Sequence, residues 1–198
     1  MCLSAAPPEI RAQAIQRICE IINLASELET ALIIGGARGR FSSTPPSADE
    51  YAWTVEALGE CVRYASLRGV PTLLEPINRY ETNFVNTLAE GLHLLDEIGE
   101  PSFKLLADAF HMNIEEVDIS TSLRQAGERI GYVHIADSNR RAPGQGHTDF
   151  RAIFQSLAQI GYCGPVSAEM LPLPDDLTAL HQLSSFLLAL DVQHTVSA

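Results

Sequence analysis

Positive charge is scarce in this chain of 198 residues. Lys and Arg together number 13 against 25 Asp and Glu, which gives a formal net charge of −12 at pH 7. A surface this acidic repels phosphate groups, so nucleic acid and anionic membranes are excluded as expected partners. No stretch is long and apolar enough to span a bilayer, and the opening residues MCLSAAPPEIRAQ lack the apolar core of a signal peptide. We therefore expect a cytoplasmic protein with no membrane partner.

The sequence also lacks paired-cysteine motifs and nucleotide-binding motifs. The four cysteines are widely scattered, with no CxxC and no zinc-type spacing, which is typical of reduced thiols rather than of a disulfide framework. No GxGxxG follows the first apolar run, and GGARGR lacks the Lys-Ser/Thr pair of a P-loop. A nucleotide-binding sheet therefore has little support.

Short apolar runs alternate with helical patterns along the whole chain. The helical patterns cover about 8–25, 48–68, 88–99, 120–129, 149–161 and 175–190, and the strand-like runs are ALIIGG (31–36), 72–77, FKLLAD (103–108), YVHIAD (132–137) and PVSAEM (165–170). Thr87 and Glu90 form a capping-box pair at the third helix, Asp149 is a cap for the fifth, and the tail QHTVSA is expected to be frayed. This alternation predicts one domain over 1–198 with a parallel sheet, either doubly wound or part of a barrel.

Four successive strands carry a metal-capable side chain near the carboxyl end. These residues are Glu75, Asp108, His134 and Glu169. In parallel α/β folds the active site is built at that edge of the sheet. Each side chain adjoins an apolar run, so burying it without a partner is costly, and a shared divalent cation removes that cost. Three carboxylates and one imidazole favour Mn²⁺, with Mg²⁺ or Co²⁺ as alternatives.

A plainer interpretation exists for the stretch LLADAFHMNIEE. An Asp directly after a strand is often a helix N-cap or a turn former, and a lone His is more often structural than a ligand. Under the metal-site hypothesis, Asp108 is a ligand and His111 lies just beyond the strand, where it reaches whatever the metal holds.

Four sequence blocks carry a resemblance to a known family. LLEPINRYETNFVNT, LADAFHMNIEE, HIADSNRRAPGQGHTDF and VSAEMLPLP resemble the xylose-isomerase-like TIM barrels of the sugar isomerase/epimerase family. Within it, the similarity is strongest to the D-tagatose 3-epimerase group, which includes the 5-keto-L-gluconate epimerases. The resemblance covers nearly the whole chain and implies the metal ligands Glu75, Asp108, His134 and Glu169.

The resemblance also implies an activity and a set of substrate contacts. Glu81, His111 and Arg140 match the substrate-contacting positions of the family. The implied reaction is epimerisation or isomerisation beside the carbonyl of a ketose or keto-aldonate, through an enediolate that a metal ion stabilises. Glu75 and Glu169 would be the two acid/bases, one removing the proton and the other returning it from the opposite side.

The chain departs from the family in length. The strand that matches ALIIGG is the fourth of eight in the family, so the resemblance implies an N-terminally truncated barrel with strands four to eight and outer helices. A complete barrel has about 250 residues. The first and last strands would then be open edges, and we expect a homo-oligomer or poor solubility, with weak or no activity for this chain alone.

Two arginines lie shortly after the first apolar run. Arg38 and Arg40 are a possible clamp for a substrate carboxylate, although such a pair is more often a solvated loop. The competing functions are a catalytically silent barrel module and an apurinic-endonuclease-type relative. The second needs more metal ligands and a basic face, which the net charge of −12 opposes.

Overall fold

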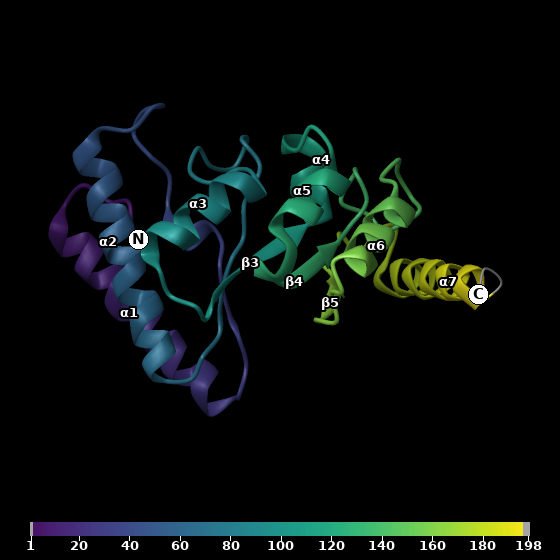
Figure 1. Cartoon of the computed structure of the whole chain (residues 1–198), viewed down its shortest axis with the longest axis horizontal. Helices are drawn as coiled ribbons and strands as arrows, with labels where there is room; N and C mark the ends of the chain where they lie inside the picture. The colour runs from purple at the N-terminus through teal and green to yellow at the C-terminus, as the bar shows by residue number, and fades with distance from the viewer. Residues whose placement is uncertain (1, 196–198) are drawn as a thin grey trace. The chain divides into compact units, whose positions relative to one another are not determined.

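Five parallel strands alternate with helices along the chain, as the sequence predicts (Figure 1). In the computed structural model, which describes residues 2–195, the strands follow one another in the sheet in chain order. They are β1 (Leu32–Ile34), β2 (Thr72–Leu74), β3 (Phe103–Asp108), β4 (Ile130–Ile135) and β5 (Val166–Ala168). The chain divides into two units, residues 1–106 and 107–198, and β3 crosses from one into the other.

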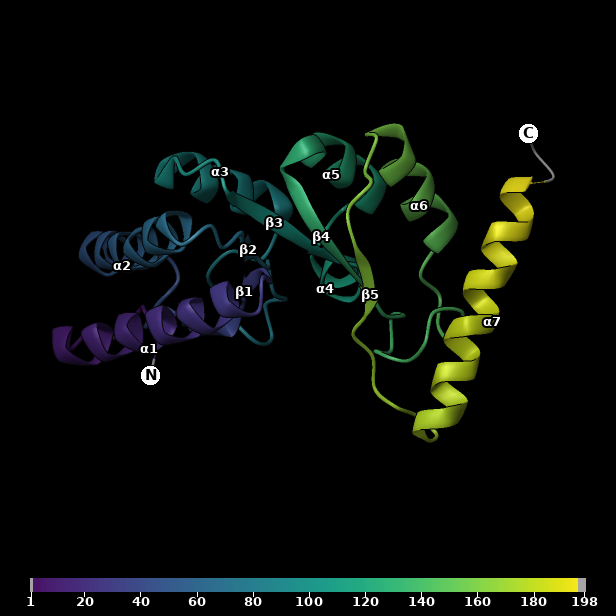
Figure 2. The ribbon, with the colours of Figure 1, turned by 90° about the horizontal axis from the view of Figure 1, so that it is seen from below.

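The first unit packs long helices beside the first strands. It contains α1 (Pro8–Glu27), α2 (Ala48–Leu67), α3 (Leu88–Ile98) and a short 3₁₀ helix η1 (Gly36–Arg38). α1 and α2 lie side by side, and Figure 2 shows them running along one another. β2 is buried at every position and pairs in parallel with β1 and β3, with Leu74 opposite Ile34 and Leu105. A strand buried on both faces needs apolar residues throughout, which TLL nearly supplies.

The predicted capping box at the start of α3 is confirmed. The Thr87 hydroxyl accepts a hydrogen bond from the Glu90 N–H, and the Glu90 carboxylate accepts one from the Thr87 N–H. At the other end, Gly99 takes a left-handed conformation with φ of 70°, and its N–H donates to the Leu95 carbonyl. Both ends of α3 are therefore fixed by local sequence.

The second unit holds the remaining strands and shorter helices. It contains α4 (Ala109–Glu115), α5 (Ile119–Ala126), the 3₁₀ helix η2 (Gly127–Arg129), α6 (Phe150–Gln159) and α7 (Asp176–Thr195). β4 and β5 pair in parallel, with His134 opposite Ser167. α5 and α6 lie side by side in both views (Figures 1 and 2). Asp149 caps α6 as predicted, its carboxylate accepting from the Ala152 N–H.

Several boundaries differ from the sequence-based prediction. α4 was not predicted, because AFHMNIE is shorter than the window in which a helical period can be recognised. β4 begins and ends two residues earlier than YVHIAD. α7 extends to Thr195, five residues beyond the predicted end at 190, and the last part of the predicted tail, 196–198, lies outside the described residues.

The strands at the two ends of the order are partly exposed. Ile33 of β1 is 39% exposed and Val166 of β5 is 40% exposed, whereas the internal strands are mostly buried. Within residues 2–195, no helix combines the length and apolar character needed to cross a bilayer.

The capping box gives a direct test of how α3 is held. Thr87→Ala removes the hydroxyl that accepts from the Glu90 N–H, and we expect the free energy of unfolding to fall by about 1 kcal/mol. Urea unfolding of both proteins measures it. Thr30→Ala, at an exposed threonine after α1, is the control and should change stability by less than about 0.5 kcal/mol. Equal effects of the two substitutions would contradict a capping role.

Candidate active site

Asp108 joins a strand to a helix and divides its two oxygens between two tasks. It is the last residue of β3 and the N-cap of α4, and it is 1% exposed. Oδ1 accepts hydrogen bonds from the N–H groups of Phe110 at 2.7 Å and His111 at 3.3 Å. The plainer interpretation of Asp108 as a helix cap is therefore confirmed. The helix cap uses only Oδ1 of Asp108, and Oδ2 faces a different set of side chains.

Three ionisable side chains of the second unit converge around Oδ2. Arg140 Nη1 donates to Asp108 Oδ2 at 3.3 Å, and Arg140 Nη2 donates to Glu169 Oε2 at 2.5 Å. Nδ1 of His134 lies 3.2 Å from Glu169 Oε2 and 3.7 Å from Asp108 Oδ2. One ligand atom from each of Asp108, His134 and Glu169 lies within 4.8 Å of the others. These three predicted ligands are thus brought together from the ends of β3, β4 and β5.

The surroundings of Asp108 favour its charged form. Burial alone would raise its pKa, but the nearby His134 imidazole, the charges of His111 and Arg140, and the His111 N–H together hold the pKa below its usual range. Glu169 differs in exposure, because half of its side chain is open to solvent while Asp108 is fully covered. The cluster therefore joins one buried carboxylate to one that a small molecule can reach.

Arg140 reaches the cluster from the loop between β4 and α6. Its guanidinium lies 4.5 Å from the ring centre of Phe110, in a cation–π contact that adds to the two ion pairs. Its backbone has a φ of 62°, a left-handed conformation that is costly for a residue with a Cβ. The loop conformation thus aims this side chain at the carboxylates.

We assigned no role to Asp137 from the sequence, although its carboxylate is fully buried in the same loop. The sequence does contain a pattern that indicates a buried carboxylate here. The acid directly follows the strand YVHIA, and Gly144 and Gly146 come a few residues later in PGQG. Glycines close behind an acid allow backbone N–H groups to approach its carboxylate.

Glu75 lies in the first unit, directly after β2. Its N–H donates to the Ile34 carbonyl at 3.3 Å, and the residue is 8% exposed. A Cβ on Gly35 would lie 2.8 Å from Glu75 Oε2, so the glycine leaves room for this carboxylate. The strand-end position predicted for Glu75 is confirmed, and the absence of a side chain at Gly35 leaves space for its carboxylate.

The other predicted substrate contacts occupy different surroundings. Glu81 is exposed in the loop after β2, where its carboxylate accepts from the Asn78 side chain at 2.8 Å. His111 is 4% exposed on α4, edge-on to the Phe110 ring. Arg40 is exposed, and only its backbone N–H and carbonyl bond with the Ser4 hydroxyl. Among these residues His111 lies beside the cluster, through its contact with Asp108.

The structure opposes the clamp interpretation for Arg38. The side chain is 0% exposed, and its three guanidinium nitrogens donate to the carbonyls of Gly35, Phe84 and Val85 at 2.8 to 2.9 Å. Burial lowers its pKa to about 10. An arginine held by three backbone carbonyls in the interior is a structural tie between two loops and does not present its fork to a substrate carboxylate.

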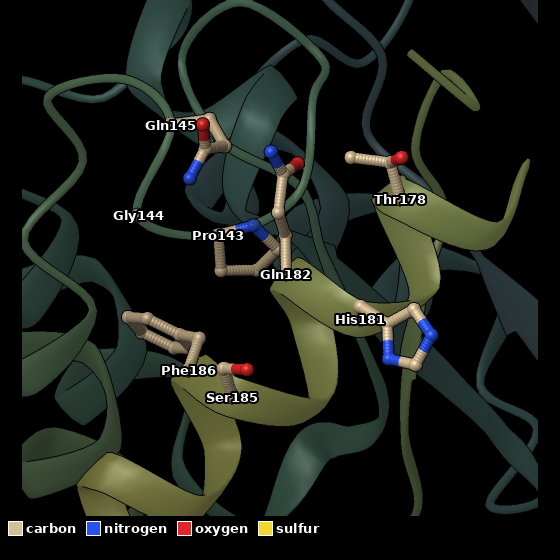
Figure 3. Close-up of a pocket in the computed structure, with 8 residues that line it drawn as sticks. All are labelled: Pro143, Gly144, Gln145, Thr178, His181, Gln182, Ser185 and Phe186. Carbon is tan, nitrogen blue, oxygen red and sulfur yellow. The ribbon is translucent and has the colours of Figure 1, made fainter. Parts of the chain in front are cut away.

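The second unit also contains a cavity of about 510 Å³ between the β4–α6 loop and α7 (Figure 3). It is lined by Pro143, Gly144, Gln145, Thr178, His181, Gln182, Ser185 and Phe186. Gln145 and Gln182 turn their amides toward the same space. None of these side chains is a carboxylate, so a pair of acids for proton transfer is not found here, and the Asp108 cluster remains the candidate active site.

A family model described as xylose isomerase-like TIM barrel matches residues 2–187. The chain belongs to this family. The match also confirms the predicted fold class, a (β/α)8-type barrel of which five parallel strands are present.

Individual relatives are sugar epimerases. An L-ribulose 3-epimerase of Methylomonas sp. is 38% identical over 157 residues, which are 79% of this chain and 54% of that protein. A 3-dehydro-D-guloside 4-epimerase of Escherichia coli is 31% identical over 81% of this chain and 64% of its own length. A solved structure of an L-ribulose 3-epimerase superposes with a TM-score of 0.87 at 30% identity, over 100% of this chain and 75% of that one. The chain thus spans about half the length of the curated relatives it matches.

Removal of the Arg38 side chain tests whether it ties the fold together. We expect Arg38→Met to lower the free energy of unfolding by about 2–4 kcal/mol, because three buried carbonyls lose charged donors. Chemical denaturation measures the change. Arg40→Met, at an exposed neighbour, should leave stability within about 0.5 kcal/mol of the wild type. A stable Arg38→Met protein with impaired binding of keto-aldonates would instead restore the clamp.

Proposed function

We propose that this chain is a divalent-metal-dependent sugar epimerase or isomerase that acts beside the carbonyl of a ketose or keto-aldonate. The observation that carries the proposal is the convergence of Asp108, His134 and Glu169 at three strand ends, with Arg140 against both carboxylates. Membership of the family and the epimerase names of its relatives support the same reaction class.

The names of the relatives differ in the reacting carbon but agree in its chemical setting. A ribulose has its ketone next to C3, and a 3-dehydro sugar has its ketone next to C4. In both cases the carbon that inverts adjoins a carbonyl group, where a C–H bond is acidic enough for proton transfer. We propose the same requirement for the substrate of this chain: a small sugar or keto-sugar acid with a carbonyl next to the reacting centre.

The donor set fits a divalent ion of the oxygen-preferring type. Asp108 and Glu169 each turn one oxygen toward the same point as His134 Nδ1, and Asp108 keeps its other oxygen for the helix cap. The family resemblance implies Glu75 as a fourth ligand, so we propose Glu75, Asp108, His134 and Glu169 as the ligands. Three carboxylates with one imidazole suit Mn²⁺, and also Mg²⁺ or Co²⁺.

When bound, the ion supplies Lewis-acid stabilisation of the negative charge that develops beside the carbonyl carbon. The chain's own residues then move the proton. We assign Glu75 and Glu169 as the two acid/bases: one takes the proton from the carbon, and the other donates a proton to the opposite face, which inverts the centre. Arg140 and His111 hold substrate oxygens on which charge develops, and Glu81 contacts the sugar.

Two alternatives make different predictions. A catalytically silent module would bind neither metal nor sugar productively. An apurinic-endonuclease-type relative would need a basic surface for DNA, and the net charge of −12 disfavours it.

We further propose a homo-oligomer in the cytoplasm, supported by the partly exposed strands at both ends of the sheet order. Sedimentation velocity tests the oligomer, and a monodisperse monomer would contradict it.

Turnover with added metal is the first test of the proposed function. Because the first three strands of the family barrel have no counterpart here, we expect at most weak epimerisation of a member of a panel of ketoses and keto-aldonates in the presence of Mn²⁺, and loss of that activity with a chelator. Incorporation of solvent deuterium at the reacting carbon, measured by NMR, reports the proton transfer directly. Metal-independent turnover would contradict the metal site, and cleavage of abasic DNA would favour the endonuclease alternative.

Amide substitutions separate the acid/bases from the other carboxylates. Glu75→Gln and Glu169→Gln keep the size of the side chain but cannot accept the proton, so we expect turnover to fall by about 10³-fold or more while the sugar still binds. Glu56→Gln, on an exposed face of α2, is the matched control and should keep its activity. Near-normal turnover in either Glu75→Gln or Glu169→Gln would rule out the two-base scheme.

A further inference from the structure

The carboxylate of Asp137 is enclosed by the backbone of the loop that follows β4. Oδ1 accepts from the N–H groups of Ser138 at 2.7 Å and Thr148 at 3.1 Å, and Oδ2 accepts from the Gly144 N–H at 2.8 Å. Asp137 is 0% exposed. Burial alone would raise the pKa of Asp137, but all of these partners are N–H donors that favour an ionised carboxylate, and they hold the pKa below its usual range.

The main chain of Asp137 holds the same loop from within. Its carbonyl accepts from the Arg140 N–H at 2.7 Å, and its N–H donates to the Arg141 carbonyl at 2.9 Å. Arg140 between them has a φ of 62°. A left-handed conformation costs a residue with a Cβ roughly 1–2 kcal/mol, so other contacts must hold it in place. Asp137 provides two of these contacts, and the Leu171 N–H provides another by donating to the Arg140 carbonyl at 2.6 Å.

Two glycines of the loop lie close to the carboxylate and to α7. A Cβ on Gly146 would clash with Asp137 Oδ1 and with the Ser138 hydroxyl. Behind the loop, a Cβ on Gly144 would lie 3.2 Å from the ring of Phe186 on α7, which forms the wall of the cavity in Figure 3. The loop is thus fixed against the carboxylate on one side and against α7 on the other.

The consequence of this arrangement appears at the tip of the Arg140 side chain. Its guanidinium spans Asp108 and Glu169, which come from different strands, and it covers the Phe110 ring. A shift of the loop by about 1 Å would break this geometry, since hydrogen bonds weaken steeply with distance and angle. The partners of Asp137 described above are backbone groups of its own loop, so its influence on the guanidinium passes through that loop.

We propose that Asp137 is the positioning residue that fixes Arg140 over the carboxylates of Asp108 and Glu169, and thereby sets how strongly the site binds substrate oxygens. The statement about substrate rests on the proposed function, whereas the statement about Arg140 stands on the loop alone. Asp137 is not a catalytic residue, because it acts through Arg140.

Asp137→Asn is the first variant, because the amide has the same shape but turns one acceptor into a donor that faces backbone N–H groups. We expect amide hydrogen exchange of the loop, residues 138–148, to become at least tenfold faster. On the sugar that the wild type turns over, kcat/KM should fall by 10- to 100-fold. In an Arg140→Gln background the same substitution should change kcat/KM by less than threefold, since the group that it positions is already gone.

Gly146→Ala perturbs the same carboxylate without removing it, and it should reproduce both effects. The matched control is Glu50→Gln. Glu50 is another buried carboxylate that holds a loop, accepting from the N–H and the hydroxyl of Ser42 at 2.8 Å. Its substitution should lower stability but leave kcat/KM within threefold and the exchange of 138–148 unchanged. If the loss of kcat/KM came only from lower stability, Glu50→Gln would show the same loss.

The outcomes separate this proposal from the proposed function. If the wild type turns over no sugar, the epimerase proposal fails, yet loop exchange and the guanidinium NMR signals of Arg140 still test its positioning by Asp137. Loop exchange and Arg140 signals that stay unchanged in both Asp137→Asn and Gly146→Ala would overturn the positioning role. So would an equal loss of kcat/KM in the wild-type and Arg140→Gln backgrounds.

Discussion

Two carboxylates that face the same point need a positive charge between them. Oxygens of Asp108 and Glu169 lie within 4.8 Å of each other and of His134. At that separation their repulsion is about 1–3 kcal/mol, and the lower part of the range applies because Glu169 is half exposed. Arg140 offsets the repulsion in this structure by bonding to both. A divalent ion at this point would concentrate more positive charge than the arginine provides.

The junction between β3 and α4 shows how one side chain serves both fold and site. Oδ1 of Asp108 satisfies two N–H groups at the start of α4, groups that have no partner within the helix. Because Oδ1 is fixed there, Oδ2 has a single direction, toward His134 and Arg140. A helix cap and a metal ligand are therefore compatible assignments, and the first orients the second. Conformational entropy that would otherwise be lost on ligand binding has already been lost on folding.

The sequence was informative where function follows from position along a strand. A polar residue directly behind an apolar run marks the carboxyl end of a strand, and this placed Glu75, Asp108 and Glu169 at strand ends. It was uninformative where partners are distant in the chain. Arg38 bonds to carbonyls 46 and 47 residues away, and no local pattern distinguishes such a residue from a solvated arginine. The cage around Asp137 was missed for a related reason, because its donors are backbone groups, which leave little trace in residue identity.

Strand ends and loops contribute to this site in different ways. The acids follow directly from hydrogen-bonded strands, so the sheet register sets their positions and a change in one requires a change in the backbone. Arg140 is carried by a loop in which it has an unfavourable φ, and main-chain hydrogen bonds and a buried carboxylate both hold that loop. Such a loop can change its length or its tip without disturbing the sheet. Under the proposed function, proton transfer would thus depend on the sheet itself, whereas recognition of sugar oxygens would depend on a separate loop that a buried carboxylate stabilises.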